Sequence, residues 1–152
     1  MDAIDRKILA ELQGNGRASL QEISQAAGLS STPCWTRMKR MEDEGVIERY
    51  TVNLNAEALG LGDTVLVQLT LDSHSDNTLE KFGQVLASIP EVVEAYLVSG
   101  EYDYLLRVAV KDTKHYERLL REKLYKIKGI RHSKSSFVLR TLKKADLPLG
   151  QI

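Results

Sequence analysis

The sequence predicts an α+β chain made of two different parts. Residues 1–54 carry three helix-like patterns followed by an extended arm. From residue 63 onward, patterns typical of strands and helices follow one another in the order β-α-β-β-α-β. The first order is that of a winged helix-turn-helix, and the second is that of a ferredoxin-like antiparallel sheet with two helices on one face. We therefore predict domains at residues 1–54 and 63–152, joined by a linker at residues 55–62.

The first two helices are predicted by their caps and their apolar spacing. Asp2 can cap the first helix, which ends at Gly14-Asn15-Gly16, and its apolar face consists of Ile4, Ile8, Leu9 and Leu12. Ser19 and Glu22 form an S-x-x-E capping box, in which each side chain accepts a hydrogen bond from an otherwise unpaired backbone N–H. This second helix is about two turns long and ends at Gly28, with Leu20, Ile23 and Ala27 on its apolar face.

The third helix is predicted to begin at Thr32-Pro33. Thr32 is a good N-cap, and proline suits the first helical position because the N–H there has no partner within the helix. The helix should reach Glu44 and end at Gly45. The segment VIERYTVNLN then has the β-branched and aromatic content of a strand or extended arm.

The second part contains four predicted strands and two predicted helices. The strands are TVLVQLTLD, EVVEAYLVSG, YLLRVAVKD and IRHSKSSFVLRTLKK. The helices are NTLEKFGQVLASI, with Leu79, Phe82, Leu86 and Ile89 on one face, and KHYERLLREKLYKI, with Tyr116, Leu119, Leu120, Leu124 and Ile127 facing inward. This pattern predicts a single core between the sheet and the two helices.

Composition limits the possible functions. Lys+Arg and Asp+Glu both number 21, so a formal net charge of zero excludes a protein that coats nucleic acid by charge alone, although a local basic face remains possible. The single cysteine cannot form a disulfide within the chain. The segment MDAIDRKILAEL lacks the features of a signal peptide, and no apolar run approaches the ~20 residues of a membrane span. We expect a soluble, cytoplasmic protein that does not bind a membrane.

The segment LSSTPCWTRMKR is the first candidate site. On a helical wheel, Cys34 and Trp35 fall on the same stripe as Met38 and Met41, so we predict that both face the core. A thiol or metal site is disfavoured, because His74, His115 and His132 lie far away in sequence without metal-type spacing. The remaining side chains and the helix N-terminus suit phosphates and base edges in the major groove. The predicted DNA-binding residues are Ser30, Ser31, Thr32, Pro33, Thr36, Arg37, Lys39 and Arg40.

The segment SGEYDYLLRV is the second candidate site. Gly100 permits a tight turn that carries two carboxylates, Glu101 and Asp103. One interpretation is a polar hairpin tip. The other is an effector site, in which the carboxylates hold the ammonium group of an amino acid, with hydroxyl groups supplied by Ser133, Ser135 and Ser136. Nothing nearby completes a catalytic set, so we predict no catalytic residue, metal or cofactor.

Together these motifs resemble the Lrp/AsnC, or feast/famine, family of transcription regulators. DRKILAELQGNGR and LSSTPCWTRMKRMEDEGVI are similar to its winged helix-turn-helix, and SGEYDYLLRV and SSFVLRTLKKADLPL are similar to its ligand-binding domain. The resemblance implies a regulator of amino-acid metabolism that binds double-stranded DNA. It also implies a homodimer that forms through the C-terminal sheets and assembles to a tetramer or octamer.

The resemblance also implies where an effector binds. Amino acids bind between dimers, near the loop that matches Gly100, Glu101, Tyr102, Asp103 and Tyr104, with Ser133 to Ser136 lining the same region. STPCW and GEYDYL resemble members that respond to cysteine or other sulfur amino acids, and leucine-responsive members share much of this sequence. Two alternatives remain: a module that binds a protein instead of DNA, and an enzyme on a ferredoxin-like scaffold.

Overall fold

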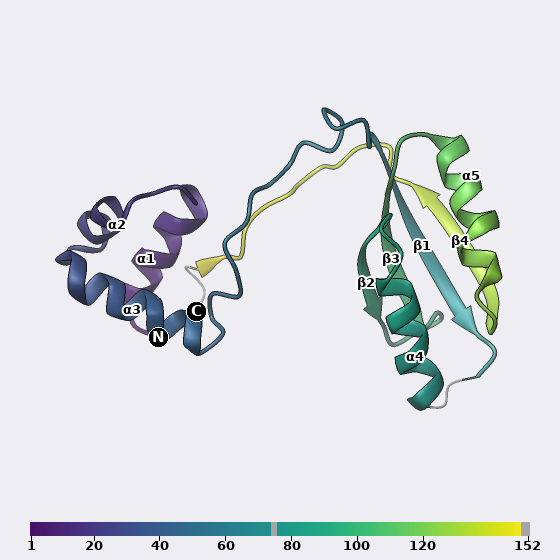
Figure 1. The fold of residues 1–152 in the computed structure, drawn as a ribbon, viewed down its shortest axis with the longest axis horizontal. Helices are drawn as coiled ribbons and strands as arrows, with labels where there is room; N and C mark the ends of the chain where they lie inside the picture. Colours follow the sequence, from purple (N-terminus) through teal and green to yellow (C-terminus); the bar gives the residue numbers. More distant parts are fainter. Residues whose placement is uncertain (74–75, 150–152) are drawn as a thin grey trace. The chain divides into compact units, whose positions relative to one another are not determined.

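The computed structural model describes residues 1–73 and 76–149, and His74 lies outside these ranges. The chain forms two compact units (Figure 1). One contains residues 1–54 together with residues 143–149, and the other contains residues 55–142. No helix in the described part of the chain is long and apolar enough to cross a membrane.

The N-terminal unit consists of three helices: α1 (Ala3–Gly14), α2 (Leu20–Ala27) and α3 (Ser31–Asp43). Both predicted caps are confirmed. The Asp2 side chain accepts from the N–H groups of Ile4 and Asp5, and Ser19 and Glu22 form the capping box. Gly28 ends α2 in the left-handed region, with φ 73°. The core of this unit contains Ile8, Ile23, Ala27, Cys34 and Met41.

The start of α3 differs from the prediction. Ser30, rather than Thr32, is the N-cap, and the N–H of Cys34 donates to the Ser30 carbonyl at 3.3 Å. Pro33 therefore occupies the third helical position. This position accepts proline equally well, because N–H groups in the first turn have no partner within the helix. The predicted end is confirmed, since Glu44 is the C-cap and Gly45 has φ 72°.

Of the two forms predicted after α3, a strand or an extended arm, the structure has the extended arm. Residues 48–55 have no regular secondary structure, although the alternating side chains Tyr50, Val52 and Leu54 have the period of a strand. These three are 53%, 69% and 66% exposed. A strand needs a neighbouring strand to pair its backbone, and none lies beside this segment in the described part of one chain. The segment 46–55, called the arm below, therefore continues from the end of α3 without a partner strand in the described part of the chain.

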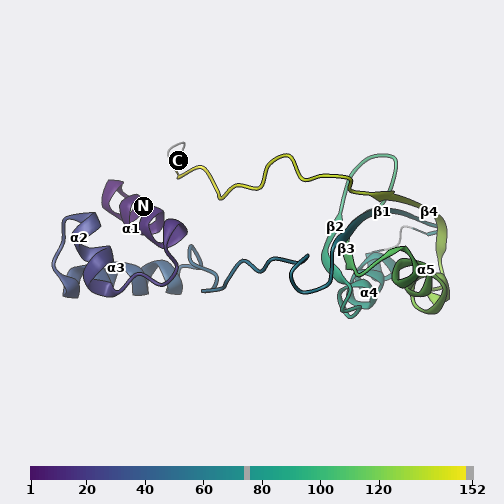
Figure 2. The ribbon, with the colours of Figure 1, turned by 90° about the horizontal axis from the view of Figure 1, so that it is seen from above.

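The second unit is a four-stranded antiparallel sheet with two helices on one face (Figure 2). Its strand order is β2-β3-β1-β4, which confirms the ferredoxin-like prediction. The elements are β1 (Asp63–Leu71), α4 (Asp76–Ala87), β2 (Val92–Leu97), β3 (Tyr104–Val110), α5 (Thr113–Glu122), the 3-10 helix η1 (Leu124–Lys126) and β4 (Ile130–Phe137).

The two faces of this sheet differ. Alternate residues of β1 and β3 are buried under the helices: Val65, Val67, Leu69, Leu71, Tyr104, Leu106, Val108 and Val110. The other face carries Leu66, which is 37% exposed, and Tyr96, which is 50% exposed. One chain thus leaves this second face, called the open face below, uncovered by its own helices.

The boundary of the last predicted helix also differs from the prediction. The last helix was expected to be continuous over residues 114–127, but α5 ends at Glu122 and a separate turn, η1, follows. The break lies at Lys123, whose ammonium donates to both Glu91 oxygens at 2.8 and 2.7 Å. Residues 143–149 group with the helical unit, where Gln13 Nε2 donates to the Leu147 carbonyl at 3.4 Å.

Candidate functional site

The exposed face of α3 is the first candidate site. Helix α3 follows α2 through a short turn at residues 28–30, and its first turn presents Ser31, Thr32 and Pro33 to solvent. The Thr36 hydroxyl donates to the Thr32 carbonyl at 3.0 Å, so the hydroxyl would meet a ligand as an acceptor. Lys39 is half exposed and lies 2.8 Å from Asp43 one turn later. This face offers small hydroxyl groups and one cation.

Arg37 and Arg40, both predicted to contact DNA, bind carboxylates at the start of α1. Arg37 Nη1 lies 2.7 Å from Asp2 Oδ2 and 2.8 Å from Asp5 Oδ1. Arg40 Nη2 lies 2.7 Å from Asp5 Oδ2. Asp5 is 1% exposed, so two guanidinium groups of α3 bind one buried carboxylate of α1. These arginines hold the two helices together, whatever else they contact.

The pKa values of Asp5 and Asp2 are consistent with these contacts to Arg37 and Arg40. Burial alone would raise the pKa of Asp5, but the Asp2 N–H, the Arg37 guanidinium and the charge of Arg40 together lower it. The pKa of Asp2 falls to about 2, mainly because its carboxylate accepts from the Asp5 N–H and also from Arg37. Both carboxylates are therefore ionised at neutral pH.

Cys34 and Trp35, which are adjacent in sequence, differ in burial. Cys34 is fully buried, as predicted, and burial raises the pKa of its thiol, which disfavours the reactive thiolate. Trp35 was predicted to lie in the core, but it is 57% exposed. It lies ~100° around the helix from Cys34, just beyond the buried stripe. Across the described residues, no group of three or more His, Cys, Asp or Glu side chains is placed to hold a metal ion.

The loop between β2 and β3 is the second candidate site. Gly100 has φ 133°, a conformation that other residues rarely adopt, and Glu101 is exposed. The Asp103 carboxylate accepts from the Leu71 N–H at 2.7 Å, and the Asp103 N–H donates to the Leu69 carbonyl at 2.9 Å. Asp103 therefore ties the loop to the end of β1. Tyr102, beside it, is half-buried.

Tyr104 connects this loop to an open groove. Its ring is 3% exposed and lies 5.4 Å from the Phe82 ring, and its hydroxyl donates to the Leu79 carbonyl. Burial raises the pKa of this hydroxyl. The groove has a volume of ≈ 520 Å³ and is lined by Leu79, Glu80, Gly83, Ala87, Ala95, Leu97 and Tyr104. Its walls are mainly apolar, and Glu80 is the charged side chain among them.

The three serines of β4 point to different faces. Ser133 and Ser135 pair with Leu69 and Val67, so they face the helices. Ser135 Oγ lies 2.6 Å from the Tyr116 hydroxyl, with which it shares a hydrogen bond. Ser136 pairs with Leu66 and therefore lies on the open face. The eight predicted effector residues thus do not form one cluster within a chain.

Comparisons with known proteins identify both units. Residues 1–48 match the family described as winged helix-turn-helix DNA-binding, and residues 64–148 match the Lrp/AsnC ligand binding domain. The chain belongs to the Lrp/AsnC family. It is 38% identical to the leucine-responsive regulatory protein of Klebsiella pneumoniae, over 96% of this chain and 89% of that protein. It is also 38% identical to the DNA-binding transcriptional activator DecR of Escherichia coli K12, over 98% of this chain and 99% of that protein.

Solved structures of this family have the same fold. An AsnC family transcriptional regulator from Agrobacterium tumefaciens matches with a TM-score of 0.93 and 39% identity, over 100% of this chain and 99% of that one. A transcriptional regulator from Neisseria meningitidis, solved as a complex with L-methionine, matches with a TM-score of 0.92 and 33% identity, over 99% and 98% of the two chains. Lrp/AsnC proteins are transcriptional regulators that bind DNA, form oligomers and are not enzymes, so the enzyme alternative is excluded.

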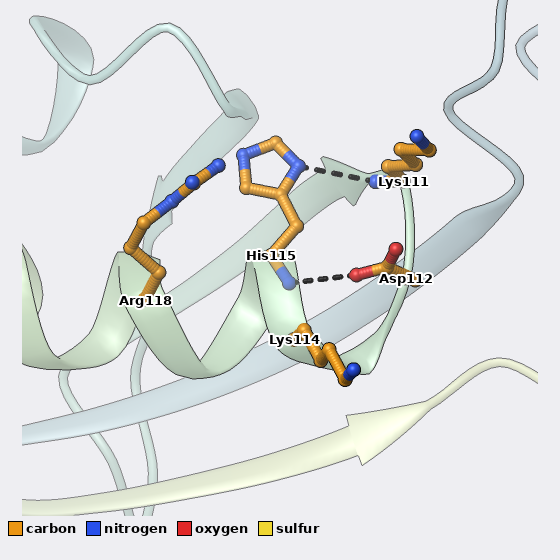
Figure 3. Close-up of a pocket in the computed structure, with 5 residues that line it drawn as sticks. All are labelled: Lys111, Asp112, Lys114, His115 and Arg118. Atoms are coloured by element: carbon orange, nitrogen blue, oxygen red, sulfur yellow. Dashed lines mark hydrogen bonds between the residues drawn. The ribbon is translucent and has the colours of Figure 1, made fainter.

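A second cavity lies at the start of α5 in this Lrp/AsnC chain (Figure 3). It has a volume of ≈ 260 Å³ and is lined by Lys111, Asp112, Lys114, His115 and Arg118. The His115 N–H donates to Asp112 Oδ1 at 2.8 Å, and the Lys111 N–H donates to His115 Nδ1 at 3.2 Å. Both bonds stabilise the first turn of α5, which accounts for Asp112 and His115 without a ligand.

The sequence reasoning missed three features of the two sites. Asp5 was not among the predicted residues, although its position beside Ile4 and Ile8 on the apolar face could have indicated burial. Trp35 was assigned to the core because it falls on the same helical-wheel stripe as Cys34 and Met41 and is a large aromatic residue. The groove beside Tyr104 combines α4, β2 and β3, and no local pattern brings these segments together.

Proposed function

We propose that this protein regulates genes of amino-acid metabolism by binding duplex DNA through α3 and an amino-acid effector through its second unit. The exposed polar face of α3, directly after α2, is the observation that supports this proposal most strongly. The DNA-binding and ligand-binding family matches of the two units support it as well. Such a regulator acts in the cytoplasm, where DNA and free amino acids meet.

The residues of α3 have different roles in this proposal. Ser30, Ser31 and Thr32 lie where the helix N-terminus offers N–H groups to phosphate or base edges, and Pro33 shapes the same turn. Thr36 and Lys39 continue the contact along the groove. Arg37 and Arg40 mainly orient α3 on Asp5, but Arg40 is 46% exposed and has donors left for a phosphate.

The effector site is proposed at the end of the sheet that carries the Gly100–Tyr104 loop. The groove beside Tyr104 has apolar walls that suit an aliphatic or thioether side chain, and Glu80 offers a carboxylate to an ammonium group. Glu101 and the serines of β4 complete the site only when chains associate, because the serines face different sides of one sheet. The L-methionine complex of the Neisseria regulator supports a small aliphatic or sulfur amino acid, such as methionine, cysteine or leucine.

A mobility-shift assay tests the DNA-binding half of the proposal. The probe is the duplex upstream of the protein's own reading frame, and the variants are Lys39→Ala and Lys81→Ala. Both remove one exposed cation, but Lys81 lies on α4 in the other unit. We expect Lys39→Ala to weaken binding and Lys81→Ala to bind as the wild type does. Equal binding by both variants would show that α3 is not part of the DNA interface.

A thermal-shift screen of the twenty amino acids tests the effector half. A ligand that binds only the native state raises its stability, by about 2.7 kcal/mol at a hundredfold excess over Kd. Gly83 lines the groove, and a Cβ added there would lie 3.8 Å from the Tyr104 hydroxyl, in ordinary van der Waals contact, so the larger side chain of Gly83→Leu should occupy groove volume. We expect at least one amino acid to raise the Tm of the wild type and to have a smaller effect on Gly83→Leu. A screen in which none changes the Tm or the oligomer distribution excludes an amino-acid effector.

A further inference from the structure

Trp35 is a large aromatic side chain exposed on a polar helix face. It is the only tryptophan of the chain, and it is 57% exposed although its helical neighbours Cys34 and Met41 are buried. Tryptophan is seldom left so exposed without a partner, because its indole combines a large apolar surface with one polar N–H. The packing of the helical unit does not use this surface.

The position of Trp35 places it on the face proposed to enter DNA. At ~100° per residue it lies ~60° from Thr32 and ~40° from Lys39, and side chains three or four residues apart are neighbours on a helix. Trp35, Thr32, Thr36 and Lys39, called the α3 strip below, therefore form one continuous exposed surface. Arg37 and Arg40 lie on the opposite flank, toward α1.

The direction of the side chain strengthens this placement. Trp35 lies in the first half of α3, and helical side chains tilt toward the helix N-terminus. In a helix-turn-helix, the N-terminal part of the second helix contacts base edges in the major groove. The indole is thus directed toward the end of α3 that meets the bases.

The chemistry of the indole matches one feature of the groove. In the major groove the C5-methyl group of thymine is the apolar contact point, and it distinguishes thymine from the other bases. The other members of the α3 strip are hydroxyl-bearing or cationic, so Trp35 is its large apolar side chain. The indole N–H can in addition donate to a phosphate or base oxygen.

We propose that Trp35 is a specificity-determining residue of this regulator, which reads a thymine methyl group in each half-site through its indole ring. The inference rests on the proposed DNA-binding function. A second copy of this chain is the competing occupant of the indole. The polar and cationic members of the α3 strip favour DNA, because the core of an interface between proteins is depleted of charged residues.

The test uses duplexes selected from a random pool by the wild-type protein. Replacing thymine by uracil removes only the methyl group, and this exchange is made at each position of the selected half-site in turn. We expect one position at which the wild type loses about fourfold in affinity, the value of one buried methyl group. Trp35→Ala should lose this sensitivity, whereas Trp35→Phe, which retains a flat apolar ring, should keep it.

Because the chain has one tryptophan, its fluorescence measures the solvent exposure of Trp35 directly. We expect the selected duplex to shield its fluorescence from acrylamide. Tyr125→Ala is the matched control, because it removes a 62% exposed aromatic ring from the other unit and should change neither readout. Circular dichroism checks that each variant is folded, and alanine and phenylalanine are both tolerated in helices.

Three results would overturn the inference. In the first, the duplex binds but Trp35 stays open to acrylamide and Trp35→Ala keeps the thymine preference. In the second, shielding without DNA rises with protein concentration, which assigns the indole to contacts between copies of the chain. In the third, the wild type selects no duplex at all, and the proposed function then fails together with the inference. The first two results leave DNA binding itself intact.

Discussion

Asp5 is a charged residue that is only 1% exposed within the helical unit. Each of its two carboxylate oxygens binds one guanidinium group, from Arg37 or Arg40. A buried carboxylate is costly unless it is fully paired, so the position of α3 on α1 depends on these bonds. Arg37 and Arg40, which the sequence assigns to DNA contact, therefore also orient the DNA-binding helix.

Asp5→Ala should lower the free energy of unfolding of the helical unit by roughly 1–3 kcal/mol, because it removes two charged hydrogen bonds and one helix-cap bond. Urea unfolding followed by circular dichroism measures this change. Asp43→Ala removes a carboxylate from an exposed pair with Lys39 and should change stability by no more than about 0.5 kcal/mol. Equal effects of the two substitutions would contradict a structural role for Asp5.

The lowered pKa values of Asp2 and Asp5 predict that the stability of the helical unit depends on pH. The folded state lowers the pKa of Asp2 from 3.8 to about 2, and it lowers the pKa of Asp5 as well. A lowered carboxyl pKa contributes stability that is present above the unfolded pKa and is lost as the pH falls toward the folded one. The helical unit should therefore lose stability between about pH 4 and pH 2.

Urea midpoints measured across that range test this dependence. An Asp2→Asn/Asp5→Asn variant, which has no carboxyl groups at these positions, is the control. Its midpoint should fall less steeply with pH than that of the wild type. Parallel slopes for the two proteins would show that other groups cause the loss of stability.

At the scale of elements, the sequence predicted the helices and strands well because local signals specify them. Caps at Asp2 and Ser19 and the left-handed Gly28 and Gly45 set helix ends through bonds within a few residues. The alternation in β1 and β3 revealed which face of the sheet is buried.

The errors occur where a distant segment decides the outcome. The wheel of α3 cannot show that α1 offers a carboxylate to Arg37, or that the core ends just before Trp35. The break between α5 and η1 lies at Lys123, which binds Glu91 from before β2. The composition of the arm allowed either a strand or an extended arm, and the choice depends on a partner strand, which the described part of one chain does not offer. The effector residues were grouped by residue type and by family resemblance, whereas pairing with β1 places Ser136 and Ser135 on opposite faces of the sheet.

Tyr104 fastens α4 to the sheet, since its hydroxyl binds the Leu79 carbonyl. Tyr104→Phe should lower the free energy of unfolding of the second unit by about 0.5–1.5 kcal/mol, the usual value of one hydrogen bond. Tyr96→Phe is the matched control, because its hydroxyl bonds to Glu94 on the exposed face. Thermal unfolding compares the two variants, and an equal or larger loss for Tyr96→Phe would refute the role given to Tyr104.

At the scale of the whole molecule, one chain leaves two strand-like surfaces uncovered. The arm exposes Tyr50, Val52 and Leu54, and the open face of the sheet exposes Leu66 and Tyr96. Exposed apolar surface of this extent on strands is typical of surfaces that pair with another chain. Oligomerisation is a property of the Lrp/AsnC family, and we predict that both surfaces pair with another chain.

Leu66→Glu should therefore shift the oligomer distribution toward monomer, because it places a charge at the centre of the open face. Sedimentation velocity measures this distribution over a range of protein concentrations. Gln25→Glu introduces the same side chain at an exposed position of α2 and should leave assembly unchanged. An unchanged oligomer distribution for Leu66→Glu would show that the open face is not the dimer interface.

The salt dependence of DNA affinity tests most directly the claim that α3 is the DNA-binding helix. Fluorescence anisotropy with a selected, labelled duplex gives the affinity of the wild type and of Thr32→Ala/Lys39→Ala between roughly 50 and 200 mM salt. We predict that the logarithm of the wild-type affinity falls linearly with the logarithm of salt concentration. The variant should bind more weakly, with a slope shallower by about one phosphate contact. Identical affinities and slopes for the two proteins would contradict the account.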